Sequence, residues 1–264
     1  MPDPAHPDPV NHVPTHLDPA TDAPDSALAP RPADPAGGTP YGLETLRGRT
    51  FAAVLFDMDG TLIDSTPAVE RSWATWAAEF GIDLSRLHGW HGVPARGLVE
   101  HLLPAEVHDR AVGRITELET ADIDGVAALP GALEALAVLS PVGRAAIATS
   151  SSDVLAEVRL SAAAVPRPPV VVTASDVERG KPAPDPYLLA AARLGVDPAD
   201  CLVVEDAPAG LRSAKAAGCA TLAVVTTTPA AELIANPDAD AVVADLADAR
   251  FVADADGVRL WARD

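Results

Sequence analysis

The chain has 264 residues, enough for one large domain or two modest ones. Hydrophobic residues make up 48% and charged residues 22% of it, so a globular fold with a core is expected. The net charge of −19, with Lys181 and Lys215 the only lysines, argues against a nucleic-acid surface, and no apolar run is long enough to span a membrane.

Residues 1–42 differ in composition from the rest of the chain. They contain 11 of the 26 prolines and six aspartates, with hardly any large apolar side chains. Such a segment cannot bury enough apolar surface to offset the entropy of ordering it. A disordered Pro/Asp-rich tail is therefore predicted for residues 1–42.

Short apolar runs alternate with helical patterns from residue 51 onward. Apolar strands separated by helices indicate βαβ units and a parallel sheet covered on both faces. The predicted strands are 51–56, 145–148, 170–173, 202–204, 221–225 and 241–243, and the predicted helices between the later ones are 130–139, 153–163, 186–194 and 208–217. The predicted fold class is α/β, a doubly wound parallel sheet built from residues 43–65 and 129–264.

Residues 66–128 interrupt this alternation. Almost ninety residues separate the first two strands, far more than a crossover connection needs. Thr66 is predicted to cap a helix with Pro67 at its first position, and two further helices are expected, one from about residue 94 and one over 105–122. Trp73 and Trp76 are interpreted as core residues of this segment, with a sugar-stacking platform as the alternative. An inserted all-helical cap domain is predicted for residues 66–128.

Polar residues stand where the first two strands end. In a doubly wound sheet the ligand site lies at the carboxyl ends of the strands, near the switch in strand order. Asp57 and Asp59 follow the first strand, where two carboxylates are costly unless a metal or a reaction uses them. Thr149 and Ser150 follow the second strand and open a helix, where hydroxyl and N–H groups form an anion site.

Three more charged residues belong to the same pattern. Lys181 stands in the loop before the helix 186–194, and Glu205 and Asp206 follow the strand 202–204. Each residue taken alone has a structural explanation, as a turn, a helix cap, a surface charge or an acidic helix entry. Their convergence on one edge of the sheet favours a catalytic site.

Four segments together resemble the motifs of the haloacid dehalogenase (HAD) superfamily. They are DMDGTL at residues 57–62, Thr149, GKP at 180–182 and VED at 204–206. The stretches RGKPAPDPY at 179–187 and VEDAPAG at 204–210 resemble the β-phosphoglucomutase-like sugar and polyol phosphatases in particular. The resemblance covers roughly residues 48–245 and implies a HAD-like Rossmannoid core with a helical cap.

The resemblance assigns roles to the core residues. Asp57 would be the nucleophile that forms an aspartyl-phosphate, and Asp59 would act as general acid and base. Thr149 and the backbone of Ser150 would hold the phosphoryl oxygens, and Lys181 would offset charge on both the nucleophile and the phosphate.

A divalent cation is expected as the cofactor, because a phosphate monoester repels an anionic nucleophile. Mg²⁺ suits carboxylate and carbonyl oxygens together with substrate phosphate. By the resemblance, its ligands would be the carboxylates of Asp57 and Asp206, the backbone carbonyl of Asp59 and the carboxylate of Glu205.

The loop 88–96 is the candidate for substrate selection in the cap. Related phosphatases often have a histidine-glycine loop with a basic residue soon after the glycine. Here His91 and Gly92 are followed by Val93 and Pro94, and the basic residue Arg96 comes later. A helix-entry histidine packed on a neighbouring tryptophan is the alternative for His91.

The sequence predicts a Mg²⁺-dependent phosphatase acting on a small phosphorylated sugar, polyol or cyclitol. A phosphomutase of the β-phosphoglucomutase type is the alternative, and a catalytically silent binding module is a remote one. The expected partner is a small-molecule phosphate ester, with neither nucleic acid nor membrane. A cytoplasmic monomer or weak homodimer is expected, with Cys201 and Cys219 as buried free thiols.

Overall fold

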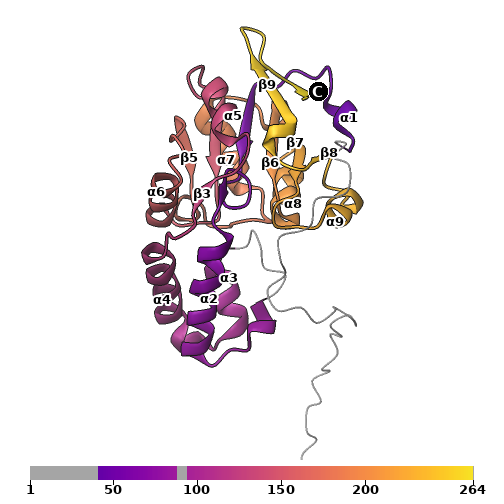
Figure 1. Cartoon of the computed structure of the whole chain (residues 1–264). Helices are drawn as coiled ribbons and strands as arrows, with labels where there is room; N and C mark the ends of the chain where they lie inside the picture. The colour runs from indigo at the N-terminus through magenta and orange to yellow at the C-terminus, as the bar shows by residue number, and fades with distance from the viewer. Residues whose placement is uncertain (1–40, 88–93, 264) are drawn as a thin grey trace, which may run out of the picture.

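The central feature of the fold is a six-stranded parallel sheet (Figure 1), seen in a computed structural model that describes residues 41–87 and 94–263. Its strands are β1 (Ala53–Phe56), β4 (Ala145–Ala148), β5 (Val170–Val172), β6 (Cys201–Glu205), β7 (Ala220–Val224) and β8 (Ala241–Val243). The order is β5-β4-β1-β6-β7-β8, so the chain moves outward from β1 on both sides. This switch point lies at the carboxyl end of β1, between β4 and β6.

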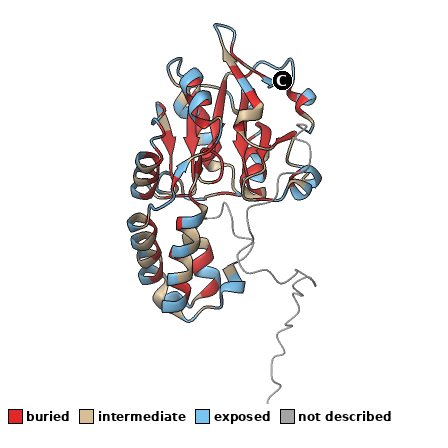
Figure 2. Cartoon of the chain, in the orientation of Figure 1, coloured by how far each residue is buried: buried red, intermediate tan, exposed pale blue. Residues whose placement is uncertain are grey.

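The strands of the sheet are largely buried, as their red colour in Figure 2 shows, and apolar residues cover both faces. One face packs against α7 (Asp185–Leu194) and α8 (Pro208–Ala216), through residues such as Leu55 and Tyr187. The other packs against α5 (Ala132–Leu139) and α6 (Asp153–Ala162), through residues such as Phe56. The predicted doubly wound α/β class is confirmed.

Residues 66–121 form a helical insertion between β1 and β4. Its helices are α2 (Thr66–Phe80), α3 (Ala95–Leu102) and α4 (His108–Ala121), with short 3-10 turns at Leu84–Leu87 and Ala105–Val107. These helices share an apolar core of their own around Trp76, whose indole N–H donates to the carbonyl of Ala111 at 2.9 Å. Trp76 is fully buried, so it belongs to this core and is no sugar-stacking surface.

A two-residue antiparallel ladder joins the insertion to the sheet. β2 (Ile63–Asp64) pairs with β3 (Ala127–Ala128) just outside the insertion. The predicted N-cap at Thr66 is wrong by one residue: Ser65 occupies the cap position of α2 and makes no side-chain cap hydrogen bond. The Ser65 hydroxyl donates to Asp59 at 2.7 Å, so this side chain serves the polar group after β1 and does not cap the helix.

Elements near both ends of the described chain are absent from the sequence predictions. Strands β9 (Ala249–Ala253) and β10 (Val258–Ala262) form an antiparallel hairpin, and α1 (Leu43–Leu46) and α9 (Ala230–Ala235) flank β8. Tyr41, inside the predicted tail, exchanges two backbone hydrogen bonds with Val242 of β8. Gly42, also in that predicted tail, occupies the N-cap position of α1, and residues 1–40 lie outside the described residues. Further 3-10 turns cover Ala174–Asp176, Pro198–Asp200 and Leu246–Asp248.

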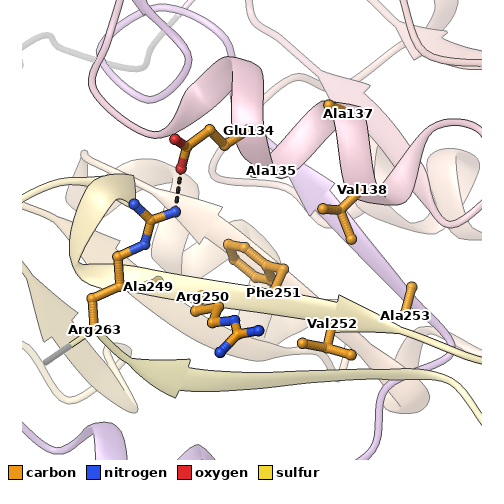
Figure 3. A pocket seen from close by; sticks show the side chains of 10 residues that line it. All are labelled: Glu134, Ala135, Ala137, Val138, Ala249, Arg250, Phe251, Val252, Ala253 and Arg263. Carbon is orange, nitrogen blue, oxygen red and sulfur yellow. Dashed lines mark hydrogen bonds and ion pairs between the residues drawn. The ribbon is translucent and has the colours of Figure 1, made fainter.

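A hollow of about 540 Å³ lies between α5 and β9 (Figure 3). Its lining includes Phe251, Val138 and the ion-paired side chains of Glu134 and Arg263. It contains none of the residues singled out by the sequence analysis.

Cys201 and Cys219 are buried free thiols, as predicted. Within residues 41–87 and 94–263, no helix combines the length and apolar character that a bilayer crossing requires.

Candidate active site

A buried lysine joins two carboxylates at the carboxyl ends of β1 and β6. The Lys181 ammonium donates to Oδ1 of Asp57 and, at 2.6 Å, to Oε1 of Glu205. The side chain of Lys181, which comes from the loop before α7, is fully buried. Asp57 directly follows β1, and Glu205 is the last residue of β6. Three segments far apart in the sequence are thus held together by one cation.

The carboxylate of Glu205 is bound on both oxygens. Oε1 accepts from the Tyr187 hydroxyl at 2.7 Å as well as from Lys181. Oε2 accepts from the backbone N–H groups of Asp206 and Ala207 at 3.1 and 3.2 Å. Glu205 therefore acts as an anchor that fixes the ammonium of Lys181 beside Asp57.

Asp206 is the third buried carboxylate of the cluster. Its Oδ1 accepts from the Thr61 hydroxyl at 3.2 Å, and its Oδ2 accepts from the Thr227 hydroxyl. The loop after β1 approaches it so closely that a side chain at Gly60 would collide with the Asp206 carboxylate. Gly60 also has a φ of +87°, which favours glycine. The turn after Asp57 thus requires the Gly60 of the DMDGTL motif.

The cluster carries more negative than positive charge. Oxygens of Asp57, Glu205 and Asp206 lie within 4.8 Å of one another, and three carboxylates face the single ammonium of Lys181. Burial raises the pKa of Asp57 well above its usual range, and Lys181 offsets only part of this rise. Burial and the neighbouring Glu205 raise the pKa of Asp206 to about 7. Clustered carboxylate oxygens with two excess negative charges fit a hard divalent cation.

Lys181 keeps its charge in this setting. Burial alone would lower the pKa of its ammonium, but the adjacent carboxylates of Asp57 and Glu205 raise it above the usual value. The same acids and burial raise the pKa of Tyr187, so its hydroxyl remains a donor to Glu205. The site therefore presents a permanent positive charge next to Asp57.

Asp59 lies two residues beyond Asp57 and has different partners. Its Oδ1 accepts from Ser65 at 2.7 Å, and its Oδ2 accepts from the Ser151 hydroxyl and from Nη1 of Arg159, both at 2.9 Å. Arg159 lies on α6, and its Nη2 donates to Glu119 of α4 at 3.1 Å. Asp59 is thus tied through one guanidinium to the helical insertion.

Thr149 and Ser150 follow β4 and lead into α6. Thr149 is buried beside the end of β1, and its hydroxyl oxygen accepts from the N–H of Ser151 at 3.1 Å. Ser152 caps α6 by accepting from the N–H of Leu155 at 3.4 Å. The two predicted phosphate-binding residues therefore lie at the neighbouring strand end, before the first turn of a helix.

The predicted substrate residues lie in or next to the insertion. His91 and Gly92 are outside the described residues. Arg96 is exposed at the start of α3, where it pairs with Asp109 at 3.2 Å and Glu100 at 3.7 Å.

The loop that carries these residues reaches the core at its C-terminal end. A Cβ at Gly180 would lie 2.6 Å from Cγ of Pro94, so Pro94 packs directly against the residue that precedes Lys181. Arg96 follows two residues later. This contact brings the start of α3 to the edge of the catalytic cluster.

Comparison with known proteins assigns the family. Residues 51–218, which include the Lys181 cluster, match the haloacid dehalogenase-like hydrolases. The chain belongs to this family. Over 175 residues this HAD-like hydrolase is 45% identical to hexitol phosphatase A of Escherichia coli (strain K12), covering 64% of this chain and 81% of the relative. Over 218 residues it is 35% identical to validoxylamine A 7'-phosphate phosphatase of Streptomyces hygroscopicus subsp. limoneus, covering 76% and 97%.

A solved structure agrees with the fold. The crystal structure of a hydrolase from Pseudomonas syringae matches with a TM-score of 0.69 and 27% identity, over 75% of this chain and 95% of that chain. The predicted resemblance to the HAD superfamily, and with it the prediction of an enzyme of the phosphatase class, is confirmed.

Several polar residues of the site were not found by sequence analysis of this HAD-like hydrolase. They are Thr61, Ser65, Glu119, Ser151, Arg159, Tyr187 and Thr227. Thr61 and Tyr187 stand inside the quoted segments and Ser151 directly follows Thr149 and Ser150, so proximity to a motif is an available signal for them. Arg159 and Glu119 stand in the last turns of the amphipathic helices α6 and α4, where charged residues are common on solvated faces, so only the fold identifies them.

Proposed function

We propose that this chain is a Mg²⁺-dependent phosphatase that hydrolyses the phosphate monoester of a small sugar, polyol or cyclitol through an aspartyl-phosphate on Asp57. One observation carries the proposal: the buried Lys181 ammonium binds Asp57 while Glu205 and Asp206 leave the cluster negatively charged. A buried strand-end carboxylate beside a fixed cation is suited to attack on a phosphate.

In the first step a carboxylate oxygen of Asp57 attacks phosphorus. The new oxygen–phosphorus bond forms as the ester bond to the substrate oxygen breaks, and the phosphoryl group passes to Asp57. The Lys181 ammonium offsets negative charge on both groups. Glu205 binds this ammonium, and Tyr187 in turn binds Glu205. The ammonium therefore stays in place while the phosphoryl group is transferred.

Asp59 handles the protons in both steps. As an acid it gives a proton to the departing alkoxide, and as a base it takes one from the water that attacks the aspartyl-phosphate. The second step releases inorganic phosphate and restores Asp57. Thr149 and the backbone of Ser150 would bind phosphoryl oxygens during both transfers, since they lie at the neighbouring strand end.

The carboxylates of Asp57 and Asp206 and the backbone carbonyl of Asp59 would hold Mg²⁺. When bound, the ion neutralises charge on the nucleophile and on the phosphate. Glu205 was predicted as a further ligand. Its two oxygens already accept four hydrogen bonds, from Lys181, Tyr187 and two backbone N–H groups, which favours the anchoring role instead.

The substrate class rests on the relatives and on the arginines of the insertion. A hexitol phosphatase at 45% identity supports a polyhydroxylated phosphate ester. A phosphomutase, the alternative, needs a cap that binds a second phosphate. Arg71 and Arg114 are each held through two nitrogens by an acid of the insertion, Asp122 and Glu79, so they are not free to bind a second phosphate, which favours the phosphatase. We also propose a cytoplasmic enzyme, a monomer or weak homodimer, in keeping with the free thiols.

The test is phosphate release by the purified chain with Mg²⁺. The substrates are hexitol phosphates, glycerol phosphate, aldose and ketose phosphates, a cyclitol phosphate and an aryl phosphate. We expect release from all active esters, with the highest kcat/KM for a polyol or sugar ester. Conversion of β-glucose 1-phosphate to glucose 6-phosphate faster than phosphate release would indicate the phosphomutase. If no ester were hydrolysed, the chain would be a catalytically silent binding module, the remote alternative.

Arg96→Ala tests the selecting role of the loop 88–96. We expect kcat/KM for the preferred polyol phosphate to fall about tenfold, because a charge-assisted hydrogen bond is lost. An aryl phosphate, whose leaving group needs little recognition, should change less than about twofold. Arg114→Ala is the matched control, since Arg114 is also an ion-paired, exposed arginine of the insertion. Equal losses on both substrates would mean that residues other than Arg96 recognise the leaving group.

A further inference from the structure

A buried guanidinium connects the acid/base candidate to the helical insertion. The side chain of Arg159 is 4% exposed, and its two terminal nitrogens bind carboxylates from different parts of the fold. Nη1 reaches Asp59 after β1, and Nη2 reaches Glu119 on α4, whose side chain is only 8% exposed. Arginine does not lose its proton in proteins, so a buried one requires counterions, and these two carboxylates supply them.

The orientation of Asp59 depends on this arrangement. Its three side-chain partners are Ser65, Ser151 and Arg159, and Arg159 also donates to the Ser151 hydroxyl at 3.2 Å. Hydroxyl groups rotate freely and impose little direction, whereas a guanidinium is a rigid planar fork. Arg159 is therefore the partner that fixes where the Asp59 carboxylate lies.

Two of the residues in this network, Ser65 and Glu119, lie at the start of the helical insertion and within it. Ser65 directly precedes α2, and Glu119 lies in the last turn of α4, which packs on α6. Because the fork is rigid, a shift of α4 relative to α6 changes the Nη2 bond and with it the placement of Nη1 on Asp59. Trp73 of α2 also lies beside Glu119 and favours its charged form, so a second helix of the insertion adjoins the same group.

We propose that Arg159 is a positioning residue for Asp59 and that, through Glu119, it couples the placement of this carboxylate to the position of the helical insertion. The inference rests on the proposed function, in which Asp59 protonates the leaving group. Its consequence is a substrate-dependent defect. An alkoxide leaves poorly without a proton, so an alkyl phosphate requires an oriented Asp59, whereas an aryl phosphate releases a stabilised phenolate.

The experiment compares a polyol phosphate with a nitrophenyl phosphate in the full-length protein with Mg²⁺. Arg159→Met alone leaves Glu119 buried without its counterion, which threatens the fold, so the main variant is Arg159→Met combined with Glu119→Gln. We expect its kcat/KM for the polyol ester to fall on the order of 10–100-fold, and that for the aryl ester to stay within about threefold. Arg159→Lys keeps one cation without the fork and should fall between this variant and wild type.

The matched control changes the exposed ion pair at the same helix. Arg167→Met combined with Glu157→Gln removes a 2.7 Å pair between side chains that are 56% and 66% exposed, and it should leave both rates unchanged. Equal losses on the two esters, or no loss on either, would overturn the positioning role. Thermal denaturation of each variant verifies that the compared proteins are folded.

The single variant Glu119→Gln tests the link to the insertion. Glutamine retains an acceptor for Nη2 but removes the competing negative charge, so Arg159 is expected to bind Asp59 more strongly than the introduced glutamine. We expect the variant to alter the ratio of the two kcat/KM values at least about threefold. An unchanged ratio overturns the coupling. A wild-type protein inactive on both esters contradicts the proposed function itself, and this result is distinct from any ratio measured on an active enzyme.

Discussion

Asp57→Asn is expected to lower phosphate release at least about 10³-fold on every ester, because an amide oxygen does not attack phosphorus. The loss should appear equally with polyol and aryl phosphates, since both require the nucleophile. This uniform loss differs from the substrate-dependent defects expected of Arg96 and Arg159. Asp256→Asn, an exposed change in the turn between β9 and β10, should keep full activity as the control.

The fold of the Asp57→Asn variant should survive. Asp57 is one of three buried carboxylates that share the single ammonium of Lys181, and burial raises its pKa well above the usual range. A neutral side chain of the same size removes one of the repelling charges and can still accept from Lys181. Without divalent cation, we expect its Tm to equal or exceed that of the wild type. Turnover within about tenfold of wild type in this folded variant would contradict the assignment of the nucleophile.

The residues around Lys181 could be predicted from sequence because each follows an apolar strand directly. Asp57 comes after β1 and Asp206 after β6, and parallel neighbours bring these ends together without further information. The hydrogen bonds that distinguish Glu205 from Asp206 could not be predicted. They depend on the Tyr187 hydroxyl, which α7 brings from 18 residues away.

The groups that orient Asp59 lay beyond sequence reasoning for a different reason. Arg159 is 100 residues from Asp59 and 40 from Glu119, so no local spacing relates them. Ser65 was overlooked because Thr66, beside Pro67, is an equally good helix cap by residue type. Ser65 is buried beside Asp59 and binds it, and this burial follows from the fold and not from the residue type.

The hairpin β9–β10 is a different case, because the sequence contained its signal. Residues 256 and 257 are Asp-Gly, a pair typical of tight turns between strands, and Phe251 and Leu260 face the core on either side.

Removal of divalent metal should abolish activity, and Mg²⁺ should restore it. The reason is electrostatic. Oxygens of Asp57, Glu205 and Asp206 lie within 4.8 Å of one another, and among the described residues Lys181 alone is ion-paired with this cluster. Burial and Glu205 raise the pKa of Asp206 to about 7. A divalent cation cancels the two excess charges. The measurement is phosphate release in a chelator, followed by titration with Mg²⁺, and full activity in excess chelator would rule out the metal.

Binding of Mg²⁺ should also stabilise the folded protein, which gives a readout independent of turnover. At 100 times its Kd a ligand that binds only the native state contributes about 2.7 kcal/mol. For a domain of this size that corresponds to a rise in Tm of roughly 5–10 °C. Asp206→Asn should reduce the rise substantially, because it removes one carboxylate from the site. Asp256→Asn should show the same rise as the wild type.

Calcium separates binding from catalysis in the same experiment. Ca²⁺ accepts more ligands at longer distances than the octahedral 2.0–2.1 Å shell of Mg²⁺. It should therefore raise the Tm of the wild type, yet it would let both oxygens of Asp57 coordinate and leave none free to attack phosphorus. We expect stabilisation without phosphate release. If Ca²⁺ supported turnover as well as Mg²⁺ does, the geometry of the ion would be irrelevant to the reaction, and charge neutralisation alone would explain the role of the metal.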